Sequence, residues 1–178
     1  GMAQKSLLLQ NLIDNLSQGV VLISSQNKIE VWNMRFAQIS QLSPNLLRAM
    51  PSTNNVQNLT ELDLAPKSST DNYYYTQTLM NGTVLEIRDH RLNNGKIIKT
   101  YSDITERHRY AESLRKSESW LRLITDNVPA MIAYIGEDLK YQFTNQVYVD
   151  WYGLPQGGLN GLELEQSRVH TNFTELKS

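Results

Sequence analysis

The chain has 178 residues, enough for one domain of ordinary size or two small ones. Its 40% apolar and 20% charged residues are typical of a globular rather than a disordered protein. The net charge of −1 favours neither nucleic acid nor an anionic membrane as a partner, and no apolar run reaches the ~20 residues that span a bilayer. Cysteine is absent, which excludes disulfides, thiolate metal sites and cysteine nucleophiles and is compatible with the cytoplasm.

The first part of the chain predicts a helix, two strands and a second, short helix. Residues 1–15 are rich in leucine and predict a helix with an apolar stripe. Residues 19–24 and 28–32 are two β-prone runs joined by a turn. Asn33 is expected to cap the short helix that follows. Residues 43–71 are rich in Ser, Asn, Pro and Thr and show only a modest helical pattern.

Three further β-prone runs follow, and each is separated from the next by an Asn-Gly pair. The runs are 73–80, 83–92 and 96–103, and the pairs are Asn81-Gly82 and Asn94-Gly95. Because Asn-Gly supplies the two positive-φ residues of a type I′ turn, the pattern predicts a three-stranded antiparallel meander. Two strands, then helices, then three strands indicate an α+β fold.

A long helix is predicted after the meander, since the chain lacks Gly and Pro from there to about Asn127. Asp103 at the N-cap and Glu106 three residues later match the Asp form of a capping box. One side of this helix has a short heptad seam, which predicts self-association. The seam consists of Tyr110, Leu114, Ser117, Leu121, Ile124 and Val128.

The sequence also repeats itself at an offset of 112 residues, without a gap from Leu12 to Ser43. The identical positions include Asp14-Asn15 and Asp126-Asn127, Ile23 and Ile135, Lys28 and Lys140, Asn33 and Asn145, and Leu42 and Leu154. Apolar character is shared at several positions between them. We interpret the repeat as two copies of one domain type.

These residues resemble the PAS family of sensor domains. The resemblance extends from Asp14-Asn15-Leu16 through Val31-Trp32-Asn33 to the stretch 100–107, which is similar to the Asp-Ile-Thr signature that closes many PAS domains. It implies a five-stranded antiparallel sheet with helices on one face, a small cavity between them, and a C-terminal helix that carries signals to a downstream kinase or cyclase. The residues implied in signal coupling are Asp103, Thr105, Glu106, Leu114 and Leu121.

The resemblance also suggests domain boundaries. We expect an N-terminal helix over 1–15, a complete PAS domain over 16–105, a connecting signalling helix over 106–127, and the N-terminal part of a second PAS domain over 128–178. The second copy then lacks its last three strands, and its exposed sheet edges could pair with another chain.

Several cofactors of PAS domains require cysteine or histidine side chains that this sequence lacks or does not place suitably. Without cysteine, the flavin-adduct and coumaroyl chromophores of light-sensing PAS domains are excluded. Haem is disfavoured, because strand alternation places His90 on the face opposite the buried one, and neither His108 nor His170 has a ligand partner at helical spacing. No metal site is predicted, and the lone carboxylates Asp63 and Asp89 are of a kind more often exposed than catalytic.

A cavity is the remaining candidate site, and a plain packed core is the alternative. The residues predicted to line it are Trp32, Phe36, Ile39, Tyr75, Leu85 and Ile87. The run Tyr73-Tyr74-Tyr75 must place residues on both sheet faces, so at least one of these tyrosines should be exposed or at an interface.

The leading hypothesis is a cytoplasmic sensor and dimerisation module of a bacterial signalling protein, most simply a two-component sensor histidine kinase. A homodimer through helices and a small-molecule ligand are expected, without contact to nucleic acid or membrane. The sensor region of a diguanylate cyclase or phosphodiesterase is an alternative that these residues do not separate. A stand-alone binding domain or small enzyme is the hypothesis from another class, although the chain carries no catalytic motif.

Overall fold

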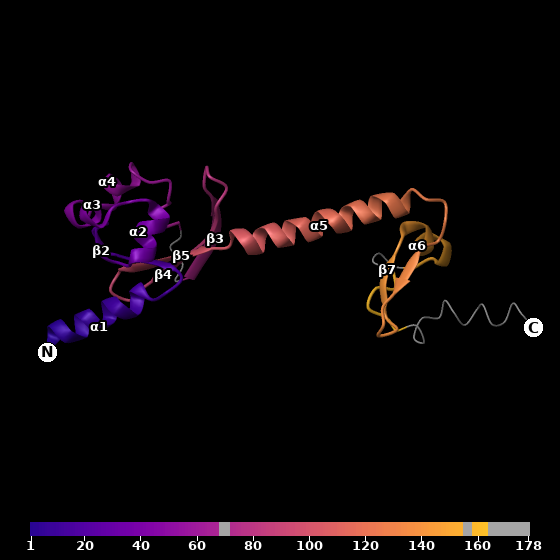
Figure 1. Ribbon diagram of the computed structural model, residues 1–178, viewed down its shortest axis with the longest axis horizontal. Helices are drawn as coiled ribbons and strands as arrows, with labels where there is room; N and C mark the ends of the chain where they lie inside the picture. The colour runs from indigo at the N-terminus through magenta and orange to yellow at the C-terminus, as the bar shows by residue number, and fades with distance from the viewer. Residues whose placement is uncertain (68–71, 155–157, 164–178) are drawn as a thin grey trace, which may run out of the picture. The chain divides into compact units, whose positions relative to one another are not determined.

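A computed structural model describes residues 1–67, 72–154 and 158–163 of the chain (Figure 1). The chain divides into two compact units, Gly1–Tyr110 and Ala111–Ser178, which we call unit 1 and unit 2. Among the described residues, no helix is long and apolar enough to cross a membrane.

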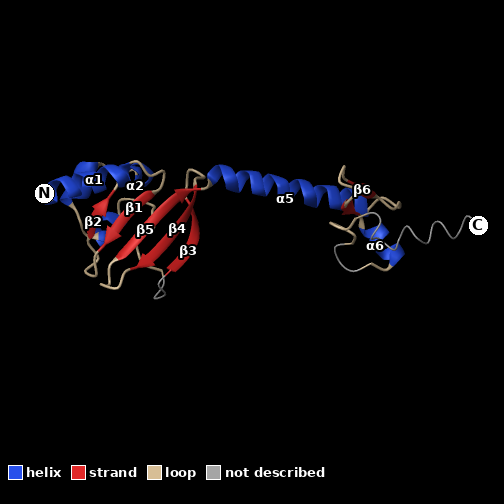
Figure 2. Ribbon diagram, turned by 90° about the horizontal axis from the view of Figure 1, so that it is seen from below, coloured by secondary structure: helices blue, strands red, loops and turns tan. Residues whose placement is uncertain are grey.

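Unit 1 is an α+β domain built on one antiparallel sheet, as predicted. Its elements are α1 (Met2–Asp14), β1 (Gly19–Ile23), β2 (Ile29–Trp32), α2 (Met34–Ser40), α3 (Pro44–Ala49), α4 (Thr53–Gln57), β3 (Asn72–Thr78), β4 (Val84–Arg91) and β5 (Ile97–Asp103). The five strands lie in the order β2-β1-β5-β4-β3 (Figure 2). Strand β1 is therefore paired on both sides, by β2 and by β5, although β5 is far away in the sequence.

The hydrophobic core lies between one face of this sheet and the short helices. The buried side chains of β1 and β4 alternate with partly exposed ones, as expected for strands with one covered face. Phe36 and Ala37 of α2, Leu47 of α3 and Val56 of α4 pack against them. Helix α1 contributes no buried residue.

Asn33 caps α2 as predicted, and its side chain accepts a hydrogen bond from the Phe36 amide. The segment 43–71, of which residues 43–67 are described, contains more helix in this described part than its composition suggests. Ser43 caps α3 and Pro44 occupies the first turn, where a missing N–H costs no hydrogen bond. Helix α4 ends at Gln57, so the predicted helical pattern at Leu59 and Leu62 does not continue as helix.

The meander is confirmed, but its turns differ from the predicted type I′. Only the glycine of each pair has a positive φ, +85° at Gly82 and +78° at Gly95, whereas Asn81 and Asn94 do not. The Gly82 amide donates to Leu79 O at 2.9 Å, which places the glycine at the end of a three-residue loop. The Asn-Gly pairs still located both hairpins correctly. Like the type I′ turn, the three-residue loop requires a residue in the left-handed conformation, which glycine adopts at the least cost.

Helix α5 (Thr105–Asp126) follows β5 after a single intervening residue and is continuous for 22 residues. Asp103 therefore lies one residue before the N-cap position, and the predicted capping box with Glu106 does not form as expected. The Asp103 carboxylate instead accepts hydrogen bonds from the amide and hydroxyl of Thr105.

Unit 2 contains the larger part of α5 together with β6 (Ala133–Ile135), β7 (Tyr141–Thr144) and α6 (Gln146–Tyr152). The two strands form an antiparallel pair. Its core, among the described residues, consists of Tyr141, Tyr148 and Leu159.

The two units share local irregularities at the offset of 112 residues. A register shift lies between Leu22 and Ile23 in β1 and between Tyr134 and Ile135 in β6. Gln41 and Gly153, at the C-caps of α2 and α6, are both left-handed. The strand–strand–helix segment of unit 2 thus reproduces that of unit 1 in detail.

Candidate functional site

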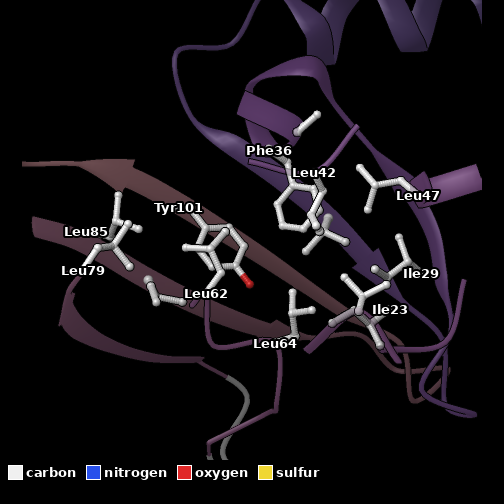
Figure 3. Packing of buried hydrophobic residues seen from close by; sticks show 14 residues of the cluster. Ile23, Ile29, Phe36, Leu42, Leu47, Leu62, Leu64, Leu79, Leu85 and Tyr101 are labelled. Carbon is white, nitrogen blue, oxygen red and sulfur yellow. The ribbon is translucent and has the colours of Figure 1, made fainter. Parts of the chain in front are cut away.

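The six residues predicted to line a cavity all belong to the inner side of unit 1. Phe36, Leu85 and Ile87 are fully buried in the main hydrophobic cluster, and the other three, Trp32, Ile39 and Tyr75, pack partly buried against it. Figure 3 shows Phe36 and Tyr101 facing each other across this core, with ring centroids 5.6 Å apart. The structure therefore brings the six together between the sheet and the helices that cover it.

A buried ion pair lies on the same face of the sheet. Lys99 of β5 is fully buried and Asp89 of β4 is 5% exposed, and Lys99 Nζ lies 2.6 Å from Asp89 Oδ1. Lys99 Nζ also donates to Tyr75 OH and Ala65 O, each at 3.2 Å. All three hydrogens of the ammonium group are thereby used, which offsets part of the cost of burying a charge.

This ion pair also connects the sheet to the segment 61–67 that lies over it. Asp89 Oδ2 accepts from the Lys67 amide at 3.1 Å, and Tyr101 OH donates to Asp63 O at 2.9 Å. The Lys67 ammonium lies 2.7 Å from the Asp63 carboxylate. Asp63 and Asp89 are thus not isolated carboxylates, because both belong to a polar network around the buried lysine.

The pKa values of this network reflect its burial. Desolvation lowers the pKa of Lys99, while the nearby Asp89 carboxylate opposes the shift. Burial also raises the pKa of Tyr75 and of Tyr101, with a further contribution from neighbouring carboxylates. The tyrosines therefore stay neutral hydrogen-bonding groups over the whole ordinary pH range.

The residues implied in signal coupling lie at the junction of β5 and α5 and along α5. Thr105 Oγ1 donates to the Asp103 carboxylate and accepts from the Val84 amide at 2.9 Å. The Ile104 amide donates to Val84 O at 2.9 Å. The start of α5 is therefore fastened to the start of β4 by side-chain and backbone bonds.

Charges next to this junction are mostly exposed. Thr105, through its hydroxyl and its amide, lowers the pKa of the Asp103 carboxyl by stabilising the ionised form. Arg107, in the first turn of α5, lies 3.7 Å from Glu86 of β4, which also pairs with Arg88 at 2.9 Å. Glu106 is exposed in the same first turn. Such exposed pairs contribute little to stability.

The apolar side chains of the α5 seam are all exposed. On α5, Leu114 is 62%, Leu121 48%, Tyr110 70% and Ile124 47% exposed. Val128, the last predicted member of the seam, lies beyond the end of the helix at Asp126 and is 38% exposed. A row of exposed apolar side chains on one helix is a feature of surfaces that bind another protein.

The two described histidines, His90 and His108, lie on different elements, β4 and α5. His90 is exposed and hydrogen bonds through Nδ1 to the Asn72 side chain, and His108 is exposed on α5. His170 lies outside the described residues. Within the described part of the chain, no three His, Cys, Asp or Glu side chains are grouped as a metal would require. Of the three consecutive tyrosines, Tyr73 and Tyr74 are exposed, as the alternation predicted for at least one.

Residues 7–72 match the family model described as the PAS domain. The matched stretch runs from α1 to the first residue of β3, and it lies in a unit that has the expected five-stranded antiparallel sheet. Residues 7–72 of unit 1 are therefore similar to the PAS domain family, a class of sensory modules.

Several solved structures of PAS domains align with the chain at low sequence identity. That of BvgS from Bordetella pertussis is 13% identical with a TM-score of 0.46, covering 67% of this chain and 97% of that one. That of nitrogen regulation protein NR(II) from Vibrio parahaemolyticus is 12% identical with a TM-score of 0.39, covering 55% and 98%. A domain of a sensory box sensor histidine kinase/response regulator from Geobacter sulfurreducens is 13% identical with a TM-score of 0.36, covering 58% and 97%. No curated protein matches the chain.

Proposed function

We propose that the chain is the sensory and dimerisation module of a larger signal-transduction protein, in which unit 1 senses and α5 carries the response. The observation that supports this most directly is the position of α5. Only Ile104 separates it from β5, and it then presents a heptad seam of exposed apolar side chains. A change in the sheet would reach the seam through the Thr105–Val84 and Thr105–Asp103 hydrogen bonds.

The proposed signal is a small molecule held against core residues of β2, β3, β4 and α2, at Trp32, Phe36, Ile39, Tyr75, Leu85 and Ile87. The buried Lys99 ammonium and the hydroxyl of the partly buried Tyr75 add polar groups on the same face. This role requires binding and a change of packing and no catalytic step, so the module itself would not be an enzyme.

The proposed domain organisation is a complete PAS domain over 16–105, a connecting helix over 106–127 and the beginning of a second PAS domain over 128–178. The support comes from the repeat: β1 is paired on both sides, while β6, which occupies the same place in unit 2, pairs with β7 alone among the described strands. Strands equivalent to β3–β5 would complete unit 2, and the equivalent of β5 would pair with β6.

The proposed parent is a cytoplasmic two-component sensor histidine kinase. Reading the coding sequence downstream of Ser178 tests this directly. Completion of the second domain followed by a phospho-acceptor histidine helix would support the proposal, whereas a cyclase or phosphodiesterase signature would replace the kinase with another output.

Self-association through the seam is tested by replacing Leu114 and Leu121 together with serine. Because burying a leucine contributes about 1.5–3 kcal/mol, each replacement should raise the dimer dissociation constant about tenfold or more. Sedimentation equilibrium over a concentration series measures this constant for the full chain.

Leu123→Ser is the matched control, since Leu123 is 56% exposed on α5 but lies outside the heptad seam. It should leave the dissociation constant nearly unchanged. A chain that is monomeric at all concentrations, or an equal effect of the control, would rule out the seam as the dimer contact.

A further inference from the structure

Asn33 is a fully buried side chain whose amide group makes four hydrogen bonds in unit 1. Its Oδ1 accepts from the amides of Val20 and Phe36, both at 2.9 Å. Its Nδ2 donates to Ile13 O at 2.7 Å and to Gln18 O at 2.8 Å. One side chain therefore joins the last turn of α1, the start of β1 and the first turn of α2.

Asn145, 112 residues later, makes the corresponding four hydrogen bonds in unit 2 and is also fully buried. Its Oδ1 accepts from the amides of Ile132 at 2.9 Å and Tyr148 at 3.2 Å. Its Nδ2 donates to Thr125 O at 2.7 Å and Ala130 O at 2.8 Å. Every partner lies 112 residues after its counterpart in unit 1, so the helix that Asn145 holds is α5.

A second side chain repeats in the same way. Asp14 Oδ1, at the end of α1, accepts from the Met34 amide at 2.8 Å. Asp126 Oδ1, at the end of α5, accepts from the Gln146 amide at 2.6 Å. Each preceding helix thus ends in a carboxylate that binds the first amide of the following short helix.

We propose that Asn145 and Asp126 form a clamp by which unit 2 holds the last turn of α5, and that Asn33 and Asp14 are the equivalent clamp on α1. This inference rests on the proposed function, in which α5 transmits the signal. Helix α5 is then fastened by side chains at both ends, through Thr105 at its start and through Asn145 at its end. A change of packing around α6 would alter the end of the seam as directly as a change in the sheet of unit 1 alters its beginning.

Asn145→Asp separates the clamp from the helix cap. A carboxylate at this position keeps both acceptor bonds to Ile132 and Tyr148, and aspartate caps a helix as well as asparagine does. It loses both donor bonds, and it places a negative oxygen beside the carbonyl oxygens of Thr125 and Ala130. The last turn of α5 should therefore be released while the first turn of α6 remains capped.

Amide hydrogen exchange of the full chain, read by NMR, measures both effects at once. In Asn145→Asp, the amides of residues 124–127 should exchange about tenfold faster or more, because two hydrogen bonds are lost. The Tyr148 amide should keep its protection. This readout does not depend on self-association, so failure of the clamp and failure of the proposed dimer are distinguishable.

Asn33→Asp is the matched variant in unit 1, which has the larger core. It should accelerate exchange at the end of α1, around Ile13, and leave 124–127 unchanged. Unaltered exchange at 124–127 in Asn145→Asp would overturn the proposal. Equal acceleration at Tyr148 would also overturn it, since Asn145 would then only keep unit 2 folded. If Asn145→Asp unfolds unit 2, Asn33→Asp decides: continued protection at Ile13 overturns the clamp, and its loss supports it.

Discussion

Lys99 and Asp89 show how a charged residue can belong to a hydrophobic core. Strand alternation puts them on the buried face of the sheet: Lys99 lies two residues from each of the buried Ile97 and Tyr101 in β5. Removing two charges from water costs several kcal/mol per ion. The attraction between the two charges and their hydrogen bonds offset much of this desolvation cost. The pair therefore contributes little net stability while making each partner strongly dependent on the other.

Asp89→Ala should destabilise unit 1 by about 3–5 kcal/mol, because it leaves the Lys99 ammonium buried without its counter-charge. The double variant Lys99→Met with Asp89→Leu should recover most of this loss, since no buried charge remains. Urea unfolding of the full chain, followed by the fluorescence of Trp32 with Trp120 and Trp151 replaced by Phe, measures both.

The ion pair of Lys96 and Glu30 is a matched control, because it has the same 2.6 Å separation but is more than one third exposed on both sides. Glu30→Ala should cost less than about 1 kcal/mol. Equal losses for Glu30→Ala and Asp89→Ala would show that burial is not what makes the Lys99 pair matter.

The junction of β5 and α5 depends on the hydroxyl of one threonine. Thr105→Val removes the acceptor of the Val84 amide and the donor to Asp103, and Val84 is buried. An unsatisfied buried amide costs about 1–3 kcal/mol, so Thr105→Val should lose about that much at neutral pH. Thr105→Ser keeps the hydroxyl and should be close to the wild type in urea unfolding.

The same variant should change the acid dependence of stability. Thr105 lowers the folded-state pKa of Asp103. The ionised Asp103 carboxylate therefore stabilises the folded state at pH values above the ordinary aspartate pKa, and this stabilisation is lost as the pH falls through the lower, folded pKa. Thr105→Val should flatten this part of the profile. A profile and a neutral-pH stability equal to those of Thr105→Ser would contradict the role assigned to the hydroxyl.

At the scale of the whole chain, the two units differ in the size of their cores. Fourteen buried apolar residues form the cluster of unit 1, and three form that of unit 2 among the described residues. Since apolar burial is the main favourable term in folding, we expect unit 2 to open at a lower urea concentration. Native-state hydrogen exchange in urea should show β7 amides reaching their opening limit before β5 amides. A common opening free energy in β5 and β7 would mean that the chain unfolds as one cooperative body.

Much of the fold was predictable because its signals are local. The Asn33 cap, the strand alternation and the two Asn-Gly pairs each depend on a few neighbouring residues, and all three correctly indicated α2 and the meander. The turn type was wrong because two loops of different length share the same glycine requirement. The alternation that placed His90 outward also placed Asp89 inward, and this signal for the buried pair was available in the sequence.

By itself, the sequence determined the α+β class, the order of the elements, the 112-residue repeat and the resemblance to PAS domains, since periodicity, turn chemistry and internal identity are readable along the chain. Only the tertiary structure decided that β5 lies between β1 and β4, that Lys99 meets Asp89, and that Asn33 and Asn145 each bind the helix before them. These contacts join residues up to tens of positions apart. Their pairing follows from strand register and packing in three dimensions, which no local pattern specifies.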